Sequence, residues 1–226
     1  ATEAFANLQL LGPEYVALEI PTPTGKEASV TLDLYRNTIF ADDFRMESSD
    51  QPGVALPLPD AVFYRGAVRG AEKSLVAITI LDGEMSGLIS YGEGTFVIGR
   101  AKSAANNEHL LYRNDDLNIQ EDFVCTALES DEYEIPEKEL SDTPKTIKCV
   151  RVRAEIDNGL VSALGGVTAA TNYVTSLYNQ VITLYANDDI DVTLAEVYAW
   201  NGSSPYSGDL ASRLYQLSNT SPNADL

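Results

Sequence analysis

The sequence predicts an α+β protein in which an antiparallel, β-rich module precedes a strand–helix–strand unit. Residues 8–112 consist of short apolar and β-branched runs separated by turn residues, which is typical of antiparallel sheets. From residue 148 the pattern changes to a strand-like run, a long helical period and a second strand-like run. This order is a βαβ unit, so we expect its two strands to be parallel.

The strands of the first module are expected from alternation and turn signals. Val30, Leu32 and Leu34 alternate with polar residues, which is the period of a half-buried strand. Asp82-Gly83 and residues 92–94 are hairpin signals, and prolines between residues 52 and 59 mark a loop. The expected strands cover residues 15–20, 28–34, 38–46, 61–68, 74–81, 85–91 and 95–98.

An acidic segment separates the two modules. Residues 114–147 are rich in carboxylates, contain Pro136 and Pro144, and offer little apolar surface to bury. We therefore expect three parts: residues 1–113 as the β-rich module, 114–147 as an exposed acidic linker, and 148–226 as the module with the βαβ unit.

The second module is expected to begin with a strand over residues 149–156. A long helix follows, with Asn158 as its N-cap and an apolar stripe at three- and four-residue spacing. Gly165-Gly166 predicts a kink or a later start of this helix. A second strand over residues 191–200 and a short helix over 208–217 complete the module.

The charge of the chain excludes several kinds of partner. Its 226 residues carry a formal net charge of −19, which repels nucleic-acid phosphates and anionic lipid headgroups. The longest apolar run, residues 74–81, is too short to span a bilayer, so we expect no membrane span. Two cysteines, Cys125 and Cys149, permit one disulfide and are compatible with an oxidising compartment.

Two stretches contain motifs that occur together in one protein family. In residues 63–89 the motif residues are Tyr64, Gly66, Val68, Arg69, Gly70, Ser74, Val76, Ala77, Ile78, Ser86, Gly87, Leu88 and Ile89. In residues 150–200 they are Asn172, Tyr173, Asn179, Val181, Tyr185, Leu194, Glu196, Val197, Tyr198 and Trp200. The first stretch resembles the prodomain of reprolysin and ADAM-type metalloproteases, which are metzincins. The second is similar to the first strand, first long helix and second strand of their catalytic domain.

This resemblance implies the N-terminal portion of a secreted zinc metalloendopeptidase precursor. Residues 1–113 would be a prodomain that keeps the protease latent and assists its folding, and residues 148–226 the truncated start of the catalytic domain. The family's zinc motif, H-E-x-x-H-x-x-G-x-x-H, is absent, because the chain has a single histidine, His109. We therefore expect no cofactor in this fragment and zinc in the full-length parent, whose partners are the remainder of the catalytic domain and protein substrates. The alternative is a non-catalytic binding or adhesion module on a degenerate protease remnant.

The cysteines have three interpretations. Cys125 lies where the family carries its inhibitory cysteine, so its thiolate is a candidate for blocking the zinc of the latent parent, although its flanks do not match the family's P-K-M-C-G-V. It is also a candidate for a disulfide with Cys149, or both thiols are free. Arg151 stands where ADAM-type domains often carry a calcium-binding glutamate, which argues against that calcium site.

Other polar and aromatic residues have plain structural interpretations. His109, between Glu108 and Leu110, is expected on the surface and not as a metal ligand. Asp188, Asp189 and Asp191 are expected in a solvated turn. Trp200 and the tyrosines of the long helix are expected in the core. Arg69 is expected to pair with a carboxylate of its own module, without a catalytic role.

Overall fold

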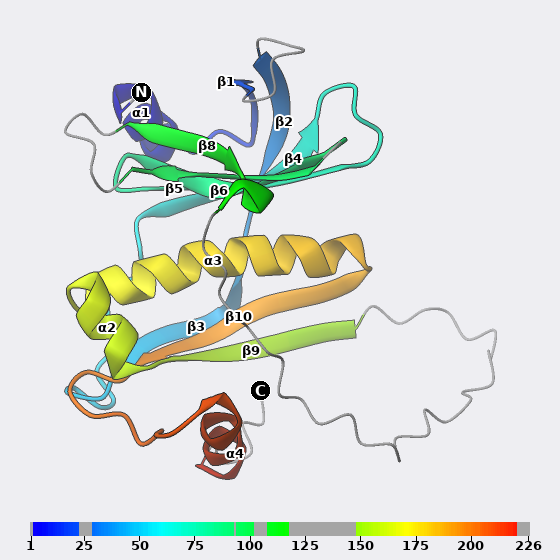
Figure 1. The fold of residues 1–226 in the computed structure, drawn as a ribbon. Coiled ribbons are helices and arrows are strands. Elements are labelled where there is room, and N and C mark those ends of the chain that lie inside the picture. Colours follow the sequence, from blue (N-terminus) through cyan, green and yellow to red (C-terminus); the bar gives the residue numbers. More distant parts are fainter. Residues whose placement is uncertain (1, 23–28, 93, 102–107, 118–147, 221–226) are drawn as a thin grey trace, which may run out of the picture.

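The computed structural model describes residues 2–22, 29–92, 94–101, 108–117 and 148–220, and it confirms the α+β class. Figure 1 shows three layers: a large antiparallel sheet, one long helix beneath it, and a small second sheet beneath the helix. In the described ranges, no helix has the length and apolar character needed to cross a membrane.

The antiparallel sheet has the strand order β1-β2-β4-β5-β6-β7-β8. Its strands are β1 (Tyr15–Pro21), β2 (Ser29–Asn37), β4 (Ala61–Val68), β5 (Ser74–Leu81), β6 (Glu84–Tyr91), β7 (Gly94–Arg100) and β8 (His109–Arg113). The sheet curves into a half-barrel whose inner face carries one apolar core, including Leu32, Ile78 and Ile89. Helix α1 (Thr2–Leu11), which the sequence pattern did not predict, packs Phe5 and Leu8 against this core.

Two glycines lie where neighbouring strands of the half-barrel approach each other closely. A Cβ atom at Gly66 would lie 2.0 Å from the carbonyl oxygen of Asp33, and one at Gly87 would lie 2.0 Å from that of Ala77. Neighbouring strands therefore approach so closely at these points that only glycine fits. This gives a physical reason for glycine at both motif positions.

The second sheet has the order β3-β10-β9, and both of its pairings are parallel. Its strands are β3 (Phe40–Ser48), β9 (Lys148–Ile156) and β10 (Ile190–Ala199). The parallel pairing expected of the βαβ unit is confirmed. The assignment of residues 38–46 to the antiparallel module is wrong, because β3 leaves that sheet and pairs with β10. The apolar residues of β3, Phe40, Phe44 and Met46, pack in the core around Leu194.

The helix between the strands of the βαβ unit is broken, as the glycine pair predicted. It forms α2 (Asn158–Leu164) and α3 (Val167–Asn187), separated by Gly165 and Gly166 with φ angles of 88° and 132°. The N-cap of α2 is Asp157 and not Asn158, since the Asp157 carboxylate accepts the N–H of Gly159. A 3-10 turn (Asn114–Asp116) and α4 (Leu210–Thr220) complete the elements.

We expect Gly87→Ala to lower the free energy of unfolding by about 1–3 kcal/mol, because the new methyl group overlaps the Ala77 carbonyl. Gly99→Ala is the matched control in β7, since a Cβ there meets no atom within 4 Å. It should change the free energy by less than about 0.5 kcal/mol. Urea unfolding of both variants measures this, and equal effects would refute the close approach.

Candidate functional site

The pairing of β3 with β10, here called the seam, joins the N-terminal half of the chain (residues 2–117) to the C-terminal half (residues 148–220). Its Cα partners run from Phe40 and Leu194 to Ser48 and Ala199. Backbone bonds close both ends: the Leu194 N–H donates to Ile39 O at 2.8 Å, and the Ser49 N–H donates to Ala199 O at 2.9 Å. Strand β10 therefore lies between one strand from each half.

A row of charges crosses all three strands of the small sheet. Glu196 on β10 accepts a hydrogen bond from Arg45 Nη2 on β3 at 2.9 Å, and Arg153 Nε on β9 lies 3.7 Å from its other oxygen. The Glu196 residue is only 5% exposed, and a buried carboxylate is costly unless it is paired. One of its two partners, Arg45, is on β3. Removal of the N-terminal half would therefore leave the buried Glu196 carboxylate with Arg153 as its remaining positive partner.

A second ion pair reaches from β9 to β3. Arg151 Nη2 donates to both carboxylate oxygens of Asp43, at 2.7 and 2.9 Å. The hydrogen bond from Arg151 lowers the pKa of Asp43 below its usual value of 3.8. The Arg151 guanidinium therefore places a fixed positive charge beside Asp43, which repels a cation at this point.

Trp200 lies half-buried beside a second acidic residue. Its indole Nε1 donates to Glu155 Oε2 at 2.9 Å, and the hydroxyl of Tyr206 donates to the same oxygen at 2.6 Å. Arg153 Nη2 pairs with the other oxygen at 3.2 Å. This cluster fastens the segment after β10 to β9, so Trp200 has a polar anchoring role in addition to its packing.

Helix α3 has two buried faces of different chemistry. Toward the small sheet it packs Val174, Tyr178 and Ile182 in apolar clusters. Toward the antiparallel sheet it buries a polar stripe at four-residue spacing, and none of its members is more than 2% exposed. We call this the Thr/Asn stripe; its members are Thr171, Thr175, Asn179 and Thr183.

The threonines of the stripe satisfy their hydroxyls inside the helix. Thr175 Oγ1 donates to Thr171 O at 2.6 Å, and Thr183 Oγ1 donates to Asn179 O at 2.7 Å. Asn179 instead reaches across the interface. Its Nδ2 donates to Ile78 O at 3.0 Å, and it also lies 3.2 Å from Thr79 Oγ1 and 3.4 Å from Tyr64 O. Asn179 is therefore the stripe residue that binds the antiparallel sheet through hydrogen bonds.

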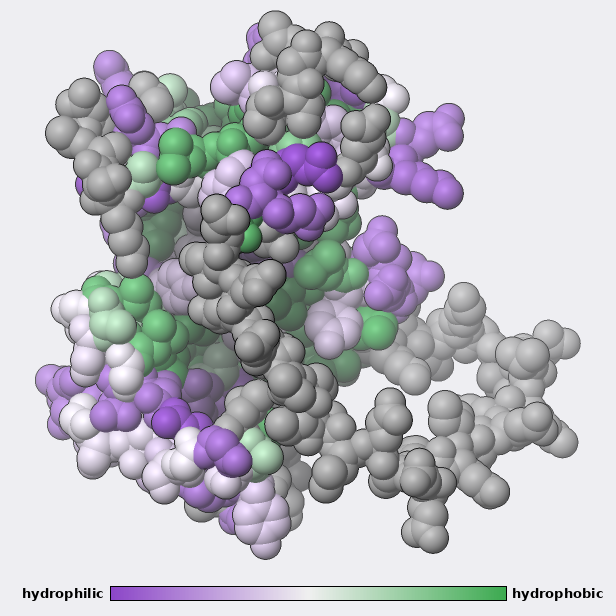
Figure 2. Space-filling model, in the orientation of Figure 1, coloured by the Kyte–Doolittle hydropathy of each residue, from purple (hydrophilic) through white to green (hydrophobic). Residues whose placement is uncertain are grey.

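A third side of α3 is apolar and exposed. Tyr173, Leu177, Leu184 and Tyr185 are each more than 40% exposed, so the expectation that the helix tyrosines lie in the core is wrong for Tyr173 and Tyr185. Figure 2 shows apolar surface over α3, between the two sheets. Among the described strands, β9 has β10 on one edge and none on the other. The exposed side of α3 and the open edge of β9 are surfaces that further protein can cover.

Of the two cysteines, Cys149 is exposed on β9. Cys125 lies outside the described residues, so its disulfide with Cys149 and its zinc-blocking role both stay predictions. Asp188 and Asp189 lie in an exposed turn after α3. Within the described ranges no three His, Cys, Asp or Glu residues gather in a group that could hold a metal ion.

Two single residues have specific partners. Arg69 binds the Asp33 carboxylate through two nitrogens, at 2.9 and 2.5 Å, which confirms the expected pair within the first module. His109 is not a free surface residue as expected. Its ring is partly buried beside Phe5, and its Nε2 accepts the backbone N–H of Met85 at 2.9 Å. Pairing of β8 with β7 directs it inward, which its acidic neighbour Glu108 did not indicate.

No known family model matches the sequence.

Asn179→Ala should lower the free energy of unfolding by about 1–3 kcal/mol, because it removes the buried hydrogen bonds of the Asn179 amide to carbonyl oxygens of β4 and β5. Asn172→Ala, on the same helix, is the control, since Asn172 makes only a 3.5 Å contact with Asp82 at the surface. Its effect should stay below about 0.5 kcal/mol. Denaturant unfolding of both variants provides the comparison. If Asn179→Ala lowers the free energy of unfolding no more than Asn172→Ala, the stripe does not hold the halves together.

The Asp43–Arg151 pair should make the seam weaker in acid. Because the pKa of Asp43 is lowered in the folded state, its contribution is present above the unfolded value of about 3.9 and is lost as the pH falls through the folded value. Asp43→Asn should therefore reduce stability at neutral pH, and the difference from the unmodified protein should shrink as the pH falls through the lowered pKa of Asp43. Unfolding midpoints across this range test the sign, with the exposed neighbour Asp42→Asn as control. A difference that grows in acid would contradict the assignment.

Proposed function

We propose that this chain is the N-terminal portion of a secreted zinc metalloendopeptidase precursor, in which residues 1–113 assist folding and maintain latency. The observation that carries the proposal is the insertion of β3 into the sheet of the C-terminal half. In the described ranges that half contributes only β9 and β10, and a two-stranded sheet is marginal on its own. Strand β3 supplies a third strand and the apolar residues that complete the core.

The Thr/Asn stripe supports the idea that the antiparallel sheet is removable. Its threonine hydroxyls are bonded to the helix itself, so separation of the sheet would leave them satisfied and would expose a polar helix face to water. Asn179 would exchange its bonds to the sheet for bonds to water. The seam is the stronger attachment, because peeling β3 away breaks a strand ladder and two ion pairs. A prodomain held in this way stays bound until the chain between the halves is cut and β3 is released.

The remainder of the catalytic domain is the proposed partner of the exposed apolar side of α3. Tyr173, Leu177 and Leu184 form that side, and Val150 on β9 is 43% exposed. Additional strands on the open edge of β9 and a further helix beside α3 would cover these surfaces. Zinc and its three histidines would come from that remainder, since this chain has His109 alone.

The alternative function is a non-catalytic binding or adhesion module. The same exposed apolar side of α3 would then be covered by a separate partner protein. The residues encoded after Leu226 discriminate the two. A three-histidine zinc motif there supports the protease precursor, and its absence supports the binding module.

A chain cut between residues 118 and 147 tests the folding role. After cleavage at an inserted protease site, the two pieces should co-elute as one folded complex, because β3 remains paired with β10. The piece 148–226, separated in denaturant and refolded alone, should lack a cooperative unfolding transition. Trp200, the only tryptophan, lies in that piece and reports its folding by fluorescence. Re-addition of the N-terminal piece should restore the native emission.

Two variants of the N-terminal piece sharpen this experiment. Met46→Asp places a charge at a position of β3 that is 2% exposed, so it should abolish the rescue. Val54→Asp, in the exposed loop after β3, should rescue as well as the unmodified piece. Independent folding of piece 148–226, or rescue by Met46→Asp, would overturn the proposed role of β3.

A further inference from the structure

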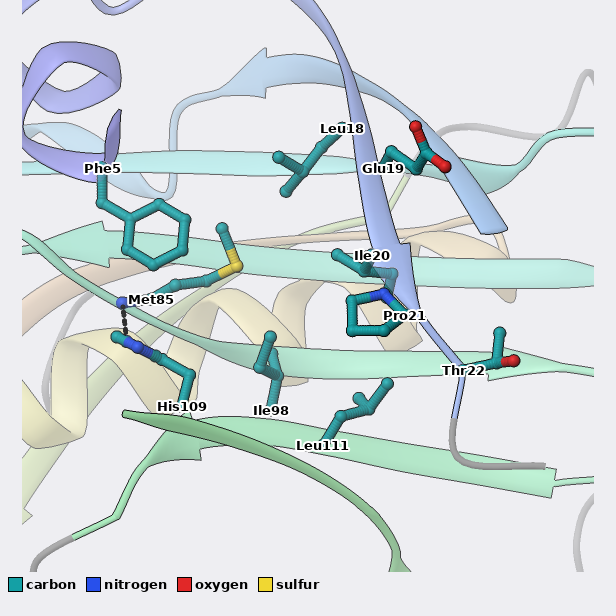
Figure 3. Close-up of a pocket in the computed structure, with 10 residues that line it drawn as sticks. All are labelled: Phe5, Leu18, Glu19, Ile20, Pro21, Thr22, Met85, Ile98, His109 and Leu111. Atoms are coloured by element: carbon teal, nitrogen blue, oxygen red, sulfur yellow. Dashed lines mark hydrogen bonds between the residues drawn. The ribbon is translucent and has the colours of Figure 1, made fainter. Parts of the chain in front are cut away.

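The half-barrel contains an apolar pocket on the side of the antiparallel sheet that faces away from α3. It lies between α1 and the two edge strands, β1 and β8, and Figure 3 shows its side chains converging from these elements and from β6 and β7. Its volume is about 330 Å³. Its walls include Phe5, Leu18, Met85, Ile98, His109 and Leu111.

The interior of the pocket is aliphatic and aromatic. Leu18 and Ile20 come from β1, Ile98 from β7 and Leu111 from β8, and all belong to or pack against the core of the half-barrel. Glu19 is exposed on the same strand and points away from the other labelled side chains in Figure 3. Charged groups therefore lie at the rim and not among the inner walls.

The imidazole ring in the wall is engaged in a hydrogen bond to the backbone. His109 Nε2 accepts the Met85 N–H at 2.9 Å. The ring also stands edge-on to Phe5, with 5.0 Å between the centroids. The residues that line the pocket include no lysine or arginine, and the net charge of −19 disfavours anions further.

The volume limits the size of an occupant. Protein interiors leave few voids larger than a water molecule, whereas ligand pockets begin at about 300 Å³. An apolar cavity of about 150 Å³ holds one benzene molecule, so this pocket has room for about two rings. We propose that it binds a neutral, apolar small molecule of this size, by burial against Leu18, Ile98 and Leu111. This site is independent of the seam and of the protease proposal.

The methionines make a direct test possible, because the chain contains only Met46 and Met85. Met85 lines the pocket, while Met46 is buried in the core of the small sheet. In the full chain with ¹³C-labelled methionine methyl groups, titration with naphthol, a neutral two-ring probe, should shift the Met85 signal in a saturable manner. The Met46 signal should stay in place. No shift of Met85 up to the solubility limit of naphthol, or equal shifts of both methyls, would overturn the proposal.

Neighbouring residues of β8 provide the matched variants. Leu111→Trp fills the pocket and should weaken naphthol binding at least about tenfold. Leu110→Trp places the same side chain on the exposed face of β8, where Leu110 is 54% exposed, and should leave binding unchanged. If Leu111→Trp lowers the melting temperature markedly, Leu18→Phe replaces it as a smaller filling change. Equal naphthol affinity in the Leu111→Trp and Leu110→Trp variants would mean that the probe binds elsewhere. Saturable binding of the anion octanoate with the same affinity as naphthol would contradict the preference for a neutral ligand.

Discussion

The hydrogen bonds between β3 and β10 decide how the two halves of the chain are arranged. In sequence β3 lies between β2 and β4, which are neighbours in the antiparallel sheet, so the chain leaves that sheet, crosses to the small sheet and returns. This excursion ties the sheets together on one side of α3, and the helix fills the space between them (Figure 1). The pairing also gives β10 a neighbour on its second edge, since β9 covers only the first. Without β3, the backbone N–H and C=O groups on that edge would need other partners.

The three sides of α3 follow from this arrangement. Its apolar side, with Val174 and Ile182, packs in the clusters that contain Leu194 and Val192 of β10. Its Thr/Asn stripe lies against the antiparallel sheet, where the Asn179 side chain donates to Ile78 O. The side with Leu177 and Leu184 has no cover in the described part of the chain. A helix with one apolar buried face, one polar buried face and one exposed apolar face agrees with the proposed precursor, which rests on the insertion of β3.

Local patterns predicted the local structure well, and the long-range partners less well. The strands at 61–68 and 74–81 and the break at Gly165 follow from alternation and glycine geometry, which depend on nearby residues only. The apolar pattern of residues 40–48 fits a strand in either sheet, so its pairing with β10 could not be read from it. Helix α1 depends on packing Phe5 against the half-barrel, and the inward direction of His109 depends on its pairing in β8. The residues of the Thr/Asn stripe recur every four positions in the sequence, but they are polar, so apolar periodicity does not predict their burial.

Amide hydrogen exchange at Leu194 tests the central claim most directly. The Leu194 N–H donates to Ile39 O of the N-terminal half, whereas the Trp200 N–H donates to Ile156 O within the C-terminal half. If β3 completes the small sheet, both amides should be protected to a similar degree in the native chain, and both should lose protection in a Met46→Asp variant. Protection at Trp200 together with exchange at Leu194 as fast as in an unstructured peptide would contradict the account.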